Sequence, residues 1–246
     1  MTTHRPTTSR RTVLRTAAAT AAGLSLSGCL GIGPLGSAGA TNDVVLDEPE
    51  NYERLADADV EYPIHAEELP EATATDPITD REVSTRGFVG ERHVLSTFIF
   101  TRCPGVCPAL TSNLRQVQAD AADQGYETEV ALLAFTFDPE YDTPERLREY
   151  GEDHGVDFDA GNWHFLRPET PDRAKEVVED RLGVFFDELS EQDRKEMDMH
   201  EDMAFEHRSL ILLANVDGYV ERAYTGGDIP NPSKLIEDVH TLRERW

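Results

Sequence analysis

The sequence predicts an α/β sandwich, in which helices flank a central mixed sheet. Two observations carry this prediction. From about residue 83 onward, short apolar runs alternate with segments whose apolar residues recur at helical spacing. Near the end, a hairpin signal and a final helical segment follow, and they give the sheet an antiparallel side. This part of the chain, roughly 160 residues, is long enough for one domain with its own core.

The predicted elements follow one another regularly. Buried strands are expected at about 93–100, 130–136, 163–166 and 209–214, and a strand at 219–224 pairs back through the turn Asp217-Gly218. Helices are expected at about 107–124, 143–154, 170–182 and 232–244. Thr143 is a good N-cap, with Pro144 at the first helical position. Strands that alternate with helices, then a hairpin and a last helix, indicate a thioredoxin-like fold.

Residues 1–28 predict an export signal. They contain four arginines and no acid, and residues 9–14 resemble a twin-arginine motif. The following stretch, 17–26, is too short and too weakly apolar to span a bilayer. Residues 26–29 look like a lipobox, so we expect cleavage before Cys29 and lipidation of its thiol. The alternative is an ordinary signal, cleaved near residues 37–40, that discards Cys29.

Residues 29–82 predict an acidic, partly disordered tether. Between residues 41 and 80 the chain holds 13 acids, four prolines and a single basic residue, Arg54. Together with the lipobox, this composition predicts a protein that is anchored to the outer face of the cell membrane. The tether would lift a folded domain, residues 83–246, off that membrane.

The charge balance is strongly negative, with 23 Lys+Arg against 48 Asp+Glu and a net charge of −25. Loss of the four signal arginines would bring it near −29, from 19 cations against 48 acids. With few lysines and a twin-arginine signal, the chain resembles a protein from an extremely halophilic archaeon, whose carboxylates hold a hydrated surface in high salt. An acidic face for a basic partner or for cation capture is the alternative. Nucleic-acid binding is disfavoured because it needs a basic footprint.

Cys103 and Cys107 are the only cysteines of the predicted domain, and they lie at a strand-to-helix junction. Once the helix starts, a spacing of four residues puts both thiols on one face. A helix N-terminus favours anions and lowers the pKa of a thiol. Such a pair can form a disulfide, bind a soft metal, or do both in turn. Because the spacing exceeds that of a redox C-x-x-C pair by one residue, two thiolates have room to share a metal, and soft thiolates select Cu(I).

A third ligand would decide between these uses, so the eight histidines matter. His207 immediately precedes the predicted strand 209–214, and in a thioredoxin-like fold the loop before that strand faces the cysteines. A neutral imidazole there would complete a copper site. The other histidines have weaker positions, and a lone histidine is more often an ordinary surface or core residue; they are His4, His65, His93, His154, His164, His200 and His240.

The chain resembles the Sco/SenC family of copper-binding, thioredoxin-like proteins that serve cytochrome oxidase assembly. The resemblance rests on residues 98–108, residues 136–144 and the stretch from Glu206 to Gly218, and it covers nearly all of 83–246. It implies copper as the bound metal, with Cys103, Cys107 and His207 as ligands. It also implies a supporting or docking role for Asp138. Its implied partner is the copper-bearing subunit of a cytochrome oxidase.

Two positions depart from the family pattern. Arg102 stands where the family often has histidine, and Glu206 and Arg208 flank His207 where it often has Asp and Ser. A permanent positive charge at Arg102 is expected to favour the Cys103 thiolate. Neither departure removes a ligand.

Two functions follow from the cysteine pair. The first is a copper metallochaperone, which is not an enzyme in the ordinary sense. The second is a membrane-anchored thiol–disulfide oxidoreductase, in which Cys103 and Cys107 act as the catalytic redox pair and keep partner cysteines reduced. Outside the cytoplasm a bare dithiol tends to oxidise, so copper loading would first need a thiol–disulfide reductant. A peroxidase is disfavoured because its usual P-x-x-x-T-x-x-C context is absent.

A cluster of soft donors lies outside the family pattern. Three methionines and a histidine fall within seven residues, just before His207: Met197, Met199, His200 and Met203. Thioether and imidazole are copper ligands, so an auxiliary copper-capture site is one interpretation. The alternatives are an amphipathic turn whose methionines pack inward, or chance.

Overall fold

A five-stranded mixed sheet forms the centre of the computed structural model, which describes residues 43–197, 204–226 and 230–246. Its strand order is β5-β4-β3-β8-β9, and β3 is parallel to β4 but antiparallel to β8. All seven residues of β3 and all seven of β4 are buried, as expected for strands covered on both faces. The bounds are β3 (His93–Ile99), β4 (Val130–Thr136), β5 (Trp163–Leu166), β8 (Leu210–Ala214) and β9 (Val220–Thr225).

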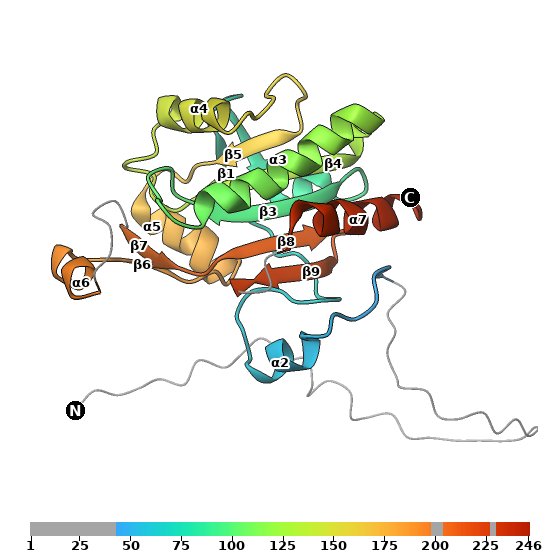
Figure 1. The fold of residues 1–246 in the computed structure, drawn as a ribbon, viewed down its shortest axis with the longest axis horizontal. Helices are drawn as coiled ribbons and strands as arrows, with labels where there is room; N and C mark the ends of the chain where they lie inside the picture. The colour runs from blue at the N-terminus through green and yellow to red at the C-terminus, as the bar shows by residue number, and fades with distance from the viewer. Residues whose placement is uncertain (1–42, 198–203, 227–229) are drawn as a thin grey trace, which may run out of the picture. The chain divides into compact units, whose positions relative to one another are not determined.

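Helices α3 (Cys107–Gln124) and α7 (Pro232–Arg243) lie side by side across one face of this sheet (Figure 1). Helix α3 buries one face along its length, through Leu110, Leu114, Val117 and Ala121. Gly125 ends it in the left-handed conformation, which closes the helix by a bond to the Ala121 carbonyl. The short 3₁₀ turn η2 (Glu127–Glu129) then leads into β4. The predicted mixed α/β architecture is confirmed.

Two further helices follow β4 and β5. Helix α4 (Pro144–Asp153) begins as predicted, because the Thr143 side chain accepts a hydrogen bond from the Arg146 backbone N–H. The predicted helix 170–182 is instead split in two. It begins as α5 (Pro171–Ala174) and continues as the π-helical segment η3 (Lys175–Arg181), a wider winding that apolar periodicity does not reveal.

The segment 43–82, which we expected to be a partly disordered tether, packs against the sheet. It contains α2 (Tyr52–Asp57) and a hairpin of β1 (Thr73–Asp76) and β2 (Arg81–Ser84), and the 3₁₀ turn η1 (Thr85–Phe88) follows. Acidic residues dominate this segment, so its few apolar residues form no clear pattern in the sequence. The larger ones are nevertheless buried in the core: Leu46, Leu55, Tyr62, Ile64 and Leu69. The folded part of the chain therefore includes this segment.

A buried carboxylate holds the start of this segment. Glu221 of β9 is fully buried and accepts hydrogen bonds from the backbone N–H groups of Val45 and Leu46. Asn215 donates both to Glu221 and to the carbonyl oxygen of Asp43. A buried carboxylate needs such donors to offset its desolvation. The chain is thus attached at the hairpin end of β8, away from the end where β8 begins beside His207.

The polar stretch before β8 forms a small hairpin. Strand β6 (Phe186–Glu188) pairs antiparallel with β7 (Phe205–His207), and helix α6 (Glu191–Glu196) lies between them in the chain. Figure 1 shows this hairpin extending from the edge of the central sheet where β8 begins. A capping box at Ser190 starts α6. Among the described residues, no helix has the length and apolar character needed to cross a bilayer.

Candidate metal centre

Three soft donors meet at the edge of the sheet where β3 ends and β8 begins. Cys103 lies in the loop after β3, Cys107 is the first residue of α3, and His207 is the last residue of β7. The two sulfur atoms and one imidazole nitrogen all lie within 4.8 Å of one another. The Cys107 Sγ lies 3.8 Å from the His207 Nε2. The structure therefore brings together the three residues that the sequence singled out.

The two cysteines are placed differently. Helix α3 begins only at Cys107, so Cys103 precedes the helix and the expected arrangement of both thiols on one helical face is wrong. Cys103 is held in a turn, where its backbone N–H donates to the Phe100 carbonyl and its sulfur accepts from the Gly105 N–H. Cys107 is completely buried, whereas Cys103 retains 5% exposure. Both cysteines are buried, and Cys103 is the less completely buried of the two.

His207 is oriented by its own strand and by aromatic side chains. Its Nδ1 lies 3.3 Å from the Arg208 carbonyl oxygen, so a proton on Nδ1 leaves the Nε2 lone pair facing Cys107. The rings of Phe100 and Phe137 pack against the imidazole at centroid distances of 5.7 and 5.0 Å. Rigid aromatic packing limits the rotamers of His207 and keeps the nitrogen near the sulfurs.

The pKa values of the two thiols move in opposite directions. The hydrogen bond from Cys107 is the main cause that lowers the pKa of Cys103 to about 4, and burial opposes this only in part. Burial raises the pKa of Cys107 far above its usual value, and its hydrogen bond to Cys103 acts in the same direction. These opposite directions favour the thiolate form of Cys103 and the protonated thiol of Cys107.

Arg102 binds the turn between β4 and α4 rather than Cys103. Its guanidinium donates from Nε and Nη2 to the Asp138 carboxylate, at 3.0 and 2.9 Å. It also lies over the ring of Tyr141, 4.5 Å from the centroid. The pKa of Cys103 is lowered mainly by the hydrogen bond from Cys107, and the expected effect of the Arg102 charge is not among its main causes. Asp138 lies next to the site but is not one of the three grouped donors.

The other described histidines lie elsewhere. His65 bonds the Glu221 carbonyl, His154 bonds the Tyr150 carbonyl, and His93 packs against Trp246. His164 pairs with Asp76 and His240 with Asp120. Several predicted features lie outside the described residues: the export signal with His4 and Cys29, and Met199, His200 and Met203 of the methionine cluster. Met197 is described and is 45% exposed.

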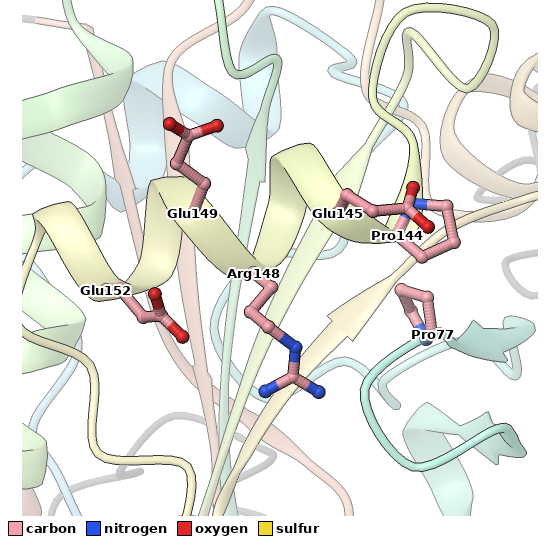
Figure 2. Close-up of a pocket in the computed structure, with 6 residues that line it drawn as sticks. All are labelled: Pro77, Pro144, Glu145, Arg148, Glu149 and Glu152. Carbon is pink, nitrogen blue, oxygen red and sulfur yellow. The ribbon is translucent and has the colours of Figure 1, made fainter.

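A hollow beside α4 is separate from this centre. Figure 2 shows Pro77 and Pro144 facing one another at one end of it, with Arg148 extending from the helix between them and Glu152. Its remaining lining residues are Glu145 and Glu149. None of these residues belongs to the Cys/His group, and the hollow contains no nucleophile or soft ligand.

A comparison with family models matches SCO1/SenC over residues 77–244. The chain belongs to the SCO1/SenC family. It is 28% identical over 159 residues to a SCO1 protein homolog of Bacillus subtilis, covering 65% of this chain and 75% of that protein.

Two solved structures show the same fold. BsSco, described as a member of the Sco family of cytochrome c oxidase assembly proteins with a disulfide switch, has a TM-score of 0.55 and 24% identity, covering 74% of this chain and 96% of that one. Arabidopsis thaliana ScoI with copper bound has a TM-score of 0.55 and 17% identity, covering 72% and 99%. The predicted family and thioredoxin-like fold are confirmed for this Sco/SenC chain.

The sequence did not reveal the polar contacts made by Thr101, which precedes Cys103 in the chain. Thr101 and Thr136 both donate to the buried carboxylate of Asp142, the second aspartate in the 136–144 stretch. Burial raises the pKa of Asp142 to about 6. Its position in the chain was visible, but its partner Thr101 lies 41 residues away. Only the parallel pairing of β3 with β4 brings them together.

Proposed function

We propose that this Sco/SenC protein is a copper metallochaperone that holds copper through Cys103, Cys107 and His207. The single observation that carries the proposal is the convergence of these three donors within 4.8 Å. Two thiolate sulfurs and a neutral imidazole form a soft set that suits copper. The family to which the chain belongs supports the same assignment.

The site is also suited to a metal ion that is bound and later released. Cys103 is near the surface and its thiolate is already favoured, so it offers the first ligand to an incoming ion. Cys107 gives up its proton only when metal binding compensates for burial of the charge. Exchange of Cys103 for a ligand of the acceptor protein would release the metal from its exposed side.

The partners and location of this chaperone are proposed from the sequence and the family. We propose that it delivers copper to the copper-bearing subunit of a cytochrome oxidase. The lipobox at Cys29 supports a lipid anchor on the outer face of the cell membrane. Asp138, neutralised by Arg102 beside the site, supports the three ligands by fixing the adjacent turn.

A second function rests on a specific observation. Cys103 and Cys107 are free thiols whose sulfur atoms lie within 4.8 Å of one another, and the pKa of Cys103 is lowered, which favours its thiolate. The same pair could reduce a disulfide of a partner protein and become a disulfide itself. This thiol–disulfide oxidoreductase needs the two sulfurs but has no use for His207.

Replacement of His207 separates the two functions. We expect His207→Ala to abolish tight one-to-one copper binding, because only two donors remain. The measurement is an anaerobic copper titration of the reduced protein in high salt, with a chelator competing for the metal. Formation of the Cys103–Cys107 disulfide should persist in the variant.

His154→Ala is the matched control, because His154 bonds a backbone carbonyl away from the site. The control should bind copper as the parent does. Parent-like copper affinity in His207→Ala would show that the three-ligand assignment is wrong.

A further inference from the structure

Two carboxylates of the turn between β4 and α4 hold the two residues that precede Cys103. Asp138 binds the side chain of Arg102, and Asp142 binds Thr101. We propose that Asp142 is a positioning residue, which keeps Cys103 in the dithiol, metal-binding geometry and opposes closure of the Cys103–Cys107 disulfide. The metal-binding half of this proposal rests on the proposed function, whereas the disulfide half does not.

The Asp142 carboxylate accepts hydrogen bonds from both the backbone N–H and the side-chain hydroxyl of Thr101. The Thr101 backbone N–H lies 3.2 Å from each carboxylate oxygen of Asp142, and the Thr101 hydroxyl donates to Oδ1 at 2.5 Å. Asp142 is fully buried, so water does not compete for these bonds. Hydrogen bonds to a buried, charged acceptor are among the stronger ones in proteins.

The carboxylate is itself held from the far side. The Thr136 hydroxyl donates to Asp142 Oδ2. Arg167 donates from Nε to the Asp142 carbonyl and from Nη2 to the Pro139 carbonyl, at 2.9 and 2.8 Å. The Asp138 backbone N–H donates to the Thr136 hydroxyl oxygen. The turn is therefore fixed to β4 and to the residue after β5, and it can act as a rigid support for Thr101.

Closure of the disulfide must move Cys103 rather than Cys107. The sulfurs are free and separated in this structure, whereas a disulfide needs an S–S distance of about 2.0 Å. Cys107 begins α3 and is completely buried in the core. The backbone N–H of Cys103 donates to the Phe100 carbonyl, and Thr101 lies within this turn, two residues after the end of β3. Thr101 is thus where a restraint on Cys103 is applied.

Removal of this restraint has two consequences. Oxidation transfers two electrons and two protons from the Cys103 and Cys107 thiols to one molecule of oxidised glutathione, which becomes two molecules of reduced glutathione. Without Asp142 the dithiol geometry loses support, so the equilibrium constant for disulfide formation should rise about tenfold, or about 30 mV for a two-electron couple. The copper affinity should fall by about the same factor, since the free sulfurs are less well placed.

Copper-free protein is equilibrated with glutathione redox buffers, and the free thiols are then counted in the parent and in four variants. Asp142→Ala removes the carboxylate, and Thr101→Val removes only the hydroxyl donor. Thr101→Ser keeps that donor and is the conservative rescue. Asp238→Ala is the matched control, because Asp238 is a buried carboxylate in α7 that accepts the Tyr224 hydroxyl and has no contact with the site. Each variant is also titrated with Cu(I) alone.

We expect a lower reduction potential of the Cys103–Cys107 disulfide in Asp142→Ala. In Thr101→Val the potential should shift in the same direction by a smaller amount. Thr101→Ser and Asp238→Ala should keep the parent potential, even if Asp238→Ala unfolds more easily. Parent-like potentials in Thr101→Val and Asp142→Ala would overturn the proposal, as would an equal shift in Asp238→Ala. If Asp142→Ala does not fold, Thr101→Val decides. Failure of the parent to bind copper would instead sink the proposed function, while the potentials would still be readable.

Discussion

Cys103 and Cys107 occupy different environments, although only three residues separate them. The first is in a turn with some exposure, and the second is buried at the start of a helix. This asymmetry follows from the point at which α3 begins, and it gives the pair one favoured thiolate and one retained proton. The same asymmetry suits a metal that enters and leaves from one side.

His93 is a buried neutral histidine, and it should make the fold sensitive to acid. Burial is the main cause that lowers the pKa of His93 to about 4. Its Nδ1 has no hydrogen-bond partner among the described residues, and the ring packs against Trp246. An unfolded histidine, with a pKa near 6.5, binds its proton first as the pH falls. Stability from His93 is therefore complete above about pH 6.5 and is lost as the pH falls towards 4.

We expect His93→Phe to lose part of this acid sensitivity. The free energy of unfolding, from denaturant titrations at pH 7 and pH 4.5, should fall by up to about 3 kcal/mol more in the parent than in the variant. His240→Phe is the comparison for a half-buried histidine that is paired with a carboxylate, that of Asp120. An identical pH dependence in the parent and in His93→Phe would show that His93 takes up its proton in the folded state.

At the scale of elements, the hairpin of β6 and β7 brings His207, the third proposed ligand, to the cysteines from 100 residues beyond Cys107. The sequence predicted His207 from its place before β8, and that placement was right. It did not predict the hairpin, because its strands are only three residues long and lie in a polar stretch. Short strands give too little periodicity to detect, and their pairing depends on contacts that are distant in sequence.

Gly183 joins two elements that sequence reasoning treated as separate. It follows η3 with a φ of +70°, and an added Cβ would collide with the backbone of Glu61 and Tyr62. The end of η3 and the segment before β1 can therefore touch only because this position has no side chain. The contact helps to explain why residues 43–82 are ordered despite their acidic composition.

Gly183→Ala should separate these elements. Gly161 is the matched control, because its φ of +67° is similar but an added Cβ would meet nothing within 4 Å. Gly161→Ala should cost about 1 kcal/mol of stability for the left-handed backbone alone. Gly183→Ala should cost about 1–3 kcal/mol more because of the collision, as measured by denaturant unfolding. Equal costs at the two positions would refute the close packing of η3 against this segment.

For the whole molecule, most of the central sheet could be predicted from the sequence and most of its periphery could not. Strands such as 130–136 are continuous apolar runs, so their burial on both faces is visible in the residues. The segment 43–82 was misjudged because its many charged residues obscured a small set of buried apolar residues. The contacts of Asp142 were missed because they cross between two parallel strands. Local pattern predicts elements, whereas contacts between elements depend on the assembled fold.

The charge of the whole chain should make its stability depend on salt. The net charge is −25 at pH 7, so the acidic side chains repel one another, and added salt screens that repulsion. We expect the midpoint of thermal unfolding to rise steadily when KCl is raised from 0.1 M to 2 M. Each kcal/mol gained should raise the midpoint by about 2–4 °C for a chain of this size. A midpoint that stays constant or falls over this range would contradict the role of salt.

The most direct test of the central claim is X-ray absorption spectroscopy of the Cu(I)-loaded protein. It reports the ligand atoms of the metal itself. If Cys103, Cys107 and His207 hold copper together, the spectrum of the parent will show two sulfur ligands and one imidazole nitrogen, and the nitrogen will be lost in His207→Ala. A spectrum with sulfur ligands alone in the parent, or an unchanged imidazole signal in His207→Ala, would contradict the account.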